Sequence, residues 1–116
     1  MTSEQTQQML NQAQLYQQQM QGLLLQRESL NMQMLEVKRA LEELEKTEQT
    51  EVYKASGPIL IKTTKEEVKK ELAEKQELIN LRLKTLEKGE KKIKERFEEI
   101  RGKLSKVVTV KPGEEE

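Results

Sequence analysis

The sequence predicts a mostly α-helical fold, a long antiparallel two-helix coiled coil with one central β-hairpin. Apolar residues recur at alternating steps of four and three over most of the chain, which is the heptad spacing of a coiled coil. The stretch VYKASGPILIK, residues 52–62, interrupts this spacing with β-branched and aliphatic residues around a Ser-Gly-Pro turn signal. The helical segments on either side are matched in length, so we expect the chain to fold back on itself at its midpoint.

Composition explains why the apolar stripe is narrow. The chain has 116 residues, of which 36% are charged and 3% are aromatic. So few large apolar side chains cannot fill the core of a globular domain. We therefore expect a single domain over residues 1–116 that is held together by a coiled-coil seam.

The first helix is expected over residues 1–48. Thr2 followed by Gln5 is typical of a helix start, because the two side chains can satisfy the first free backbone N–H groups. Arg27 interrupts an otherwise apolar seam. The seam consists of Met9, Ala13, Tyr16, Met20, Leu23, Leu30, Met34, Val37, Leu41 and Leu44.

The central β-hairpin is expected over residues 51–63. Residues 52–55 and 59–63 alternate well enough for two short strands, with Ser56, Gly57 and Pro58 as the turn. A lone two-stranded hairpin is marginally stable in water and leaves its strand edges open. We interpret the hairpin as an assembly device, which strands from other chains complete.

The second helix is expected over residues 64–108, followed by a flexible tail over 109–116. Thr64 with Glu67 forms a capping box at its start. Gln76 and Glu90 interrupt its seam. The seam consists of Leu72, Ile79, Leu83, Leu86, Ile93, Phe97, Ile100, Leu104 and Val107.

The charged interruptions of the two seams suggest a register pair. Antiparallel registers that fold the chain near residue 57 or 60 place Arg27 and Glu90 in neighbouring layers, about 5 Å apart along the axis. One interpretation is an ion pair that fixes the register of the two helices. The alternative is that the two long side chains reach water separately.

The residue types present exclude most kinds of active site. The chain has no His and no Cys, and each of its acidic residues is Glu. Nucleophilic triads and imidazole acid–base chemistry are therefore excluded, and we expect no enzyme activity, metal or cofactor. The formal net charge is zero, and Glu residues interleave with the basic cluster at 91–101. We therefore expect no nucleic-acid partner. No apolar run is long enough for a membrane span, so no membrane association is expected either.

Three features together resemble a known family, the β-type subunits of prefoldin. They are the helix–hairpin–helix order, the junction VYKASGPILIKTTKEE at residues 52–67, and LINLRLKTLEKGEKKI at residues 78–93. The resemblance implies an ATP-independent co-chaperone, and the absence of Cys is consistent with the cytoplasmic location that we expect. The resemblance implies a hexamer of two α-type and four β-type subunits whose hairpins join into a β-barrel platform. It also implies that the coiled-coil tips hold non-native client proteins and deliver them to a group II chaperonin. Carried onto this chain, the oligomerisation hairpin consists of Val52, Tyr53, Ala55, Ile59, Leu60 and Ile61.

The chain ends themselves have an unusual composition for a coiled coil. Residues 1–26 contain one charged side chain, Glu4, among many Gln and Met residues. Leu10, Leu15 and Val108 fall outside the seams, so a two-helix coil need not bury them. Met side chains adapt to varied partners, which suits a promiscuous surface. The resemblance and this composition together predict a client-binding tip formed by Met1, Met9, Leu10, Leu15, Tyr16, Met20, Leu104, Val107, Val108 and Val110.

Two more modest interpretations stay open from the residues alone. The apolar residues of the tip could instead staple the helix ends or pack on a neighbouring chain. The whole chain could also be a structural coiled-coil scaffold or tether with one defined partner, which needs no exposed tip. Protection of an unrelated aggregating protein would separate a chaperone from a scaffold.

Overall fold

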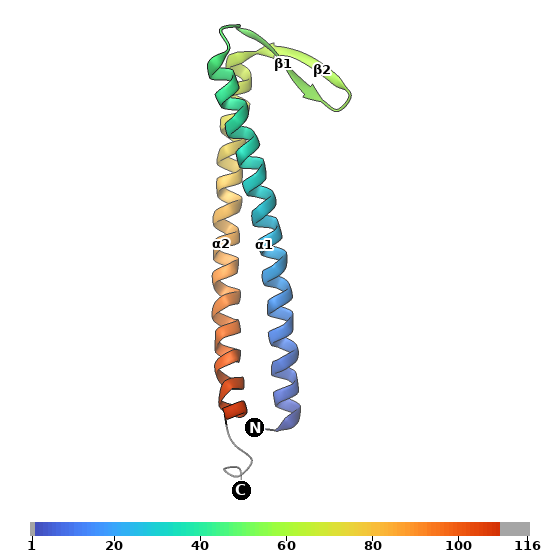
Figure 1. The fold of residues 1–116 in the computed structure, drawn as a ribbon, viewed down its shortest axis with the longest axis vertical. Coiled ribbons are helices and arrows are strands. Elements are labelled where there is room, and N and C mark those ends of the chain that lie inside the picture. The colour runs from blue at the N-terminus through green and yellow to red at the C-terminus, as the bar shows by residue number, and fades with distance from the viewer. Residues whose placement is uncertain (1, 110–116) are drawn as a thin grey trace. The chain divides into compact units, whose positions relative to one another are not determined.

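The computed structural model describes residues 2–109 of the chain, with side chains described through residue 106. The elements are helix α1 (Ser3–Lys46), strands β1 (Glu51–Ser56) and β2 (Ile59–Thr64), and helix α2 (Lys65–Thr109) (Figure 1). The predicted fold class, two long helices joined by an antiparallel β-hairpin, is confirmed. Of the predicted tail, Thr109 ends α2, and residues 110–116 lie outside the described residues.

Both helices begin with the caps that their sequences predict. At the start of α1, the Gln5 backbone N–H donates to Thr2 Oγ1 at 3.1 Å, and the Thr2 N–H donates to Gln5 Oε1 at 3.0 Å. At the start of α2, the Glu67 N–H donates to Thr64 Oγ1 at 3.2 Å. Each cap satisfies backbone N–H groups that the first helical turn leaves without a partner.

The chain divides into two compact units, each of which contains parts of both helices. One is Arg27–Lys84, and the other is formed by the described residues of Met1–Gln26 and Thr85–Glu116. In the Arg27–Lys84 unit, the last turns of α1 run antiparallel to the first turns of α2. Lys69 forms an ion pair with Glu45 across them, and the Lys65 ammonium donates to the Thr47 carbonyl oxygen at 2.9 Å.

Each unit has its own apolar core. In the Arg27–Lys84 unit, Leu30, Val37 and Leu44 from α1 are buried, and Ile79 from α2 is only 2% exposed. Burying each such side chain contributes about 1.5–3 kcal/mol. In the other unit, the buried residues are Leu86 and Ile100, both from α2.

The two seam positions differ in burial. With a and d as the heptad labels, where a precedes d by three residues, the six hydrophobic residues that are buried among residues 2–106 are all at d. The described a positions of both seams are half-buried. Arg27, Gln76 and Glu90 all occupy a positions and are half-buried too. Water therefore reaches part of each of these side chains, whereas one carboxylate oxygen of Glu90, Oε1, is itself buried.

Candidate functional site

The hairpin is closed by a two-residue turn. Strands β1 and β2 pair antiparallel from Glu51↔Thr64 to Ser56↔Ile59, which leaves Gly57 and Pro58 as the loop. Gly57 has a positive φ of 59°. A positive φ at the first loop residue matches the twist of the strands, and Gly adopts it without steric cost. The fixed negative φ of Pro58 suits the second position.

The register gives the hairpin two different faces, because residues that pair across the strands point to the same side. The first, here called the helix-side face, contains Val52, Lys54, Ser56, Ile59, Ile61 and Thr63. The second, here called the open face, contains Glu51, Tyr53, Ala55, Leu60, Lys62 and Thr64. On the open face, Tyr53 is 65% and Leu60 is 72% exposed. On the helix-side face, Val52, Lys54 and Thr63 are half-buried.

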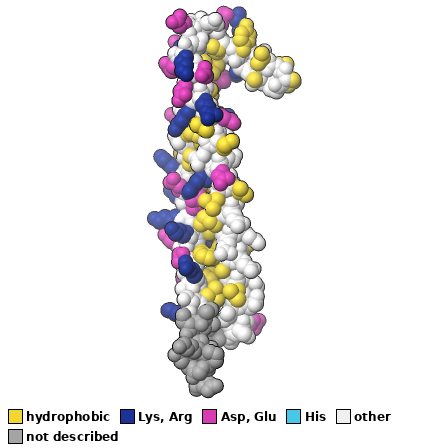
Figure 2. Space-filling view, in the orientation of Figure 1, with side chains coloured by type: hydrophobic (Ala, Val, Ile, Leu, Met, Phe, Trp, Pro, Cys, Tyr) yellow, Lys and Arg dark blue, Asp and Glu magenta, His cyan; other side chains and the backbone are white. Residues whose placement is uncertain are grey.

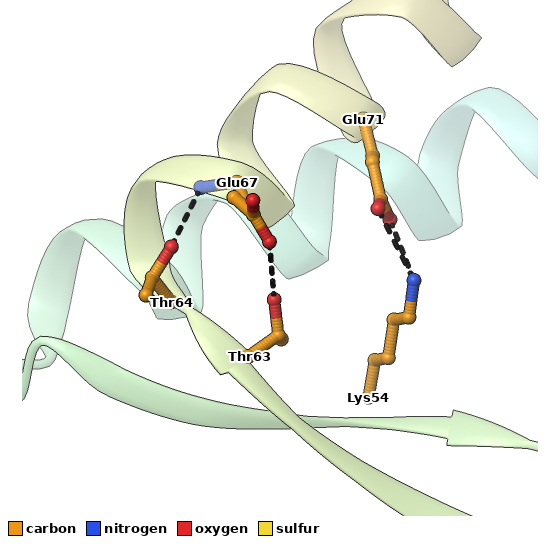
Figure 3. A network of polar contacts seen from close by, with 5 residues as sticks. All are labelled: Lys54, Thr63, Thr64, Glu67 and Glu71. Atoms are coloured by element: carbon orange, nitrogen blue, oxygen red, sulfur yellow. Dashed lines mark hydrogen bonds and ion pairs between the residues drawn. The ribbon is translucent and has the colours of Figure 1, made fainter.

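Two side-chain contacts join the helix-side face to the start of α2 (Figure 3). The Lys54 ammonium donates to both carboxylate oxygens of Glu71, at 3.1 and 3.3 Å. The Thr63 hydroxyl donates to Glu67 Oε2 at 3.2 Å. These two contacts are here called the hairpin bracket. One of them is made by β1 and the other by β2, so both strands are attached to α2.

The predicted oligomerisation residues are thus divided between the two faces. Tyr53, Ala55 and Leu60 lie on the open face, whereas Val52, Ile59 and Ile61 lie on the helix-side face. All of them except the half-buried Val52 are exposed. The charges on the open face neutralise one another, because Lys62 forms an ion pair with Glu51 at 3.1 Å. What the hairpin offers to another chain is therefore apolar and carries little net charge.

The predicted tip residues that are described fall into two groups. Leu10 is 45% and Leu15 is 51% exposed, as their positions outside the seam predict. Met9, Tyr16, Met20 and Leu104 are half-buried. Met1 and Val110 lie outside the described residues, and so do the side chains of Val107 and Val108.

An apolar pocket of about 350 Å³ lies between α1 and α2 in the unit that contains the chain ends. Tyr16 and Met20 line it from α1, and Ile93 and Phe97 line it from α2. Gln17, Gln21 and Lys94 complete the lining. The Tyr16 hydroxyl accepts a hydrogen bond of 3.1 Å from the Gln12 amide, which holds one side of this pocket in place. The size and apolar lining of the pocket suit a bulky apolar side chain, and the Gln17 and Gln21 amides beside it can donate and accept hydrogen bonds.

Charge is distributed unevenly along the chain. On the face drawn in Figure 2, charged side chains gather on α2 and on the later part of α1, and the early part of α1 is almost uncharged. A hydrogen bond from Lys69 and the charge of that ammonium group lower the pKa of the Glu45 carboxyl group. The early part of α1, residues 3–26, has one charged side chain of its own, Glu4, and Lys103 of α2 lies beside Met9 and Gln12.

Sequence reasoning missed several residues that shape these surfaces. Nothing in the sequence links Lys54 with Glu71, because Glu71 stands four residues before Lys75, a spacing typical of an ion pair on the helix surface. Ile93 and Phe97 were expected only as seam residues. Leu24 and Leu25 are exposed as well, and the heptad count, which places them outside positions a and d, was the available signal.

The structure does not test the proposed pairing of Arg27 with Glu90. Arg27 belongs to the Arg27–Lys84 unit and Glu90 to the other one, and each side chain is half-buried. Their pairing stays a prediction.

Among the described residues, no cluster of three or more acidic, His or Cys side chains is placed to hold a metal ion. Neither described helix has an apolar stretch long enough to cross a bilayer.

Comparison with known proteins gives consistent matches over most of the chain. A family model described as prefoldin subunit matches residues 7–110. The prefoldin subunit beta of Archaeoglobus fulgidus is 43% identical over 110 residues, which are 94% of this chain and 95% of that protein. The prefoldin subunit beta of Thermococcus onnurineus is 42% identical over 101 residues, 86% of this chain and 87% of that protein.

A solved structure shares the fold. The crystal structure of the prefoldin beta subunit from Thermococcus strain KS-1 superimposes with a TM-score of 0.82 at 37% identity. The match covers 90% of this chain and 93% of that one. The described hairpin and helices therefore have a crystallographic counterpart.

Proposed function

Because this chain belongs to the prefoldin subunit family and is of the β type, we propose that it captures unfolded proteins without ATP and delivers them to a group II chaperonin. The family itself consists of co-chaperone subunits and not of enzymes. Three parts of the proposal go beyond membership of this family: the site at which clients bind, the way in which the subunit assembles, and the chaperonin that receives the client.

The hairpin is the proposed site of assembly. Its six predicted residues contact the hairpins of other subunits, and together the hairpins form a β-barrel. The proposed complex is a hexamer of two α-type and four β-type chains in the cytoplasm. The exposure of Tyr53 and Leu60 supports this proposal, because the free energy falls when a partner covers large apolar side chains and removes them from water. Two strands alone leave both outer edges unpaired, and a partner strand would satisfy their backbone groups.

The tip is the proposed client site. The observation that carries this part is the exposure of Leu10 and Leu15 on a stretch of α1 with very few charges. Unfolded clients have no common sequence, so a general binder needs apolar contact without a charge that would select among clients. Met9, Tyr16 and Met20, which are half-buried, add adaptable surface around those two leucines.

Aggregation of an unrelated denatured protein, followed by light scattering without ATP, tests the client site. The variant Leu10→Ser with Leu15→Ser should assemble normally but protect the client several-fold less well. The matched control is Met32→Ser with Leu35→Ser, which removes two exposed apolar side chains from the other unit. Equal loss in both variants would mean that the tip has no special part in client binding.

The alternative function is a scaffold or tether with one defined partner. A scaffold would leave several unrelated clients unprotected, whereas the proposed co-chaperone slows the aggregation of all of them. Delivery is tested by adding a group II chaperonin with ATP to the client-loaded complex. Recovery of native client should then exceed that from spontaneous release.

A further inference from the structure

The hairpin and α2 are held together by the side-chain contacts of the hairpin bracket in addition to their direct connection along the chain. Strand β2 ends at Thr64, and α2 begins at Lys65. The Lys65 N–H donates to the Thr50 carbonyl oxygen at 2.8 Å, which closes the base of the hairpin. Without further contacts, the hairpin could still swing about this base.

The bracket removes that freedom at two separate points. Lys54 lies three residues into β1, and Thr63 lies next to the end of β2. Their partners Glu67 and Glu71 are four residues apart, so both carboxylates lie on the same face of α2. Both contacts are partly exposed, and because they involve different strands they favour one tilt of the hairpin and one rotation about the strand direction.

The partners of Glu71 show that this contact competes with a simpler one. In an isolated helix, Glu71 would pair with Lys75, four residues further on. In the folded chain its carboxylate instead accepts both hydrogen bonds from Lys54, at 3.1 and 3.3 Å. Lys54 lies on the helix-side face and contacts α2, whereas its strand neighbours Tyr53 and Ala55 lie on the open face and are exposed.

We propose that Lys54, Thr63, Glu67 and Glu71 are positioning residues that orient the hairpin before any partner arrives. They hold the helix-side face toward α2 and thereby present the open face to an incoming chain. The proposal rests on the proposed assembly through the hairpin. Its benefit is preorganisation, because a hairpin that is already oriented loses less conformational freedom when it binds.

The surface so presented also defines the kind of partner. Tyr53, Ala55 and Leu60 supply apolar contact, and the Glu51–Lys62 ion pair leaves no net charge beside them. A charged partner surface would lose its hydration there without gaining an opposite charge. The surface therefore fits another strand pair with apolar, uncharged side chains, as in a second hairpin of the same kind.

Spin labels on the full chain test the orientation directly. The chain has no Cys, so Ser56→Cys and Ala73→Cys place one label at the end of the hairpin and one on α2, both in the same unit. Pulsed electron–electron distance measurements should give one narrow distribution for the parent. Lys54→Ala should broaden it, and the charge swap Lys54→Glu with Glu71→Lys should narrow it again.

The matched control is Lys62→Ala, which removes an ion pair of the same 3.1 Å length inside the hairpin. It should leave the distribution narrow. Titration with an α-type subunit should show binding about two- to fivefold weaker for Lys54→Ala, as expected for one partly exposed ion pair. Lys46→Ala, which removes an exposed ion pair with Glu43 on α1 outside the hairpin, should leave binding unchanged.

The possible outcomes separate this proposal from the proposed assembly. An unchanged distance distribution in Lys54→Ala would overturn the positioning role, whatever the binding result. Equal weakening of binding by Lys54→Ala and Lys46→Ala would overturn it too. If lysines placed in the hairpin leave assembly intact, the assembly proposal is wrong, and the distance measurement still reports whether the bracket orients the hairpin.

Discussion

Gly89 on α2 lies beside Leu23 on α1, and a Cβ built at Gly89 would stand 3.7 Å from the Leu23 Cδ1 atom. That distance is an ordinary van der Waals contact, so Ala fits without displacement. Ala also loses less backbone freedom than Gly in a helix. Gly89→Ala should therefore raise the free energy of unfolding by about 0.5–1 kcal/mol in urea titrations followed by circular dichroism.

Two other glycines serve as controls for this prediction. Gly102 has open space around the position of a Cβ, so Gly102→Ala should give a similar gain. Gly57 has a φ of +59°, so Gly57→Ala should lower stability by about 1–2 kcal/mol. A loss of stability in Gly89→Ala together with a gain in Gly102→Ala would show that the Leu23 contact is tighter than described.

Lysines on the open face of the hairpin should prevent assembly. Tyr53→Lys with Leu60→Lys places two charges on the face that is presented to a partner, which would have to remove them from water. Helix content should change little, and native mass measurement should show loss of the complex with an α-type subunit. Met32→Lys with Leu78→Lys is the control, because it alters two exposed apolar residues of the helices. A hairpin variant that stays fully hexameric would exclude the hairpin as platform.

Removal of both chain ends should separate assembly from client protection. A chain without residues 1–10 and 107–116 keeps the hairpin and most of both seams, whose packing maintains the coil. It should assemble, while suppression of client aggregation falls sharply. Added salt should change protection by the intact protein little, because apolar contact is not screened. A truncated complex that protects as well as the parent would place client binding elsewhere.

A double-mutant cycle measures the proposed register pair. Arg27→Ala and Glu90→Ala should each lower stability, and their combination should reveal a coupling of about 0.5–3 kcal/mol. Arg27 is partly exposed, whereas the Glu90 Oε1 atom is buried, so water competes for only part of this pair. Simply additive losses would mean that the two residues do not interact.

The parts of the fold that follow from local spacing could be predicted from the sequence. The helical seams depend on the spacing of residues three and four apart, and the turn depends on Gly57 and Pro58. The helices and the hairpin could therefore be predicted without information about tertiary contacts. The exposure of Leu10 and Leu15 followed from the same count. Each of these features is decided within a few residues of chain.

The features that sequence reasoning missed depend on how separate elements meet. Nothing near Lys54 indicates that its partner is Glu71, which is 17 residues away and belongs to another element. The difference between buried d and half-buried a positions depends on how each helix is rotated toward the other. The heptad pattern treats both positions as equally apolar, and it therefore carries no information about that rotation.

The short two-residue loop has a consequence for the order of folding. Each cross-strand pair of the hairpin joins residues no more than 13 positions apart, from Ser56↔Ile59 out to Glu51↔Thr64. Contacts this local form early, and isolated hairpins close in about 1–10 μs. The slow event is then the meeting of two chains, whose rate rises with their concentration. When subunits are scarce, a newly made chain waits longer for its partner, and its strand edges stay unpaired during that time. The risk of aggregation through these edges is therefore highest when a partner is scarce.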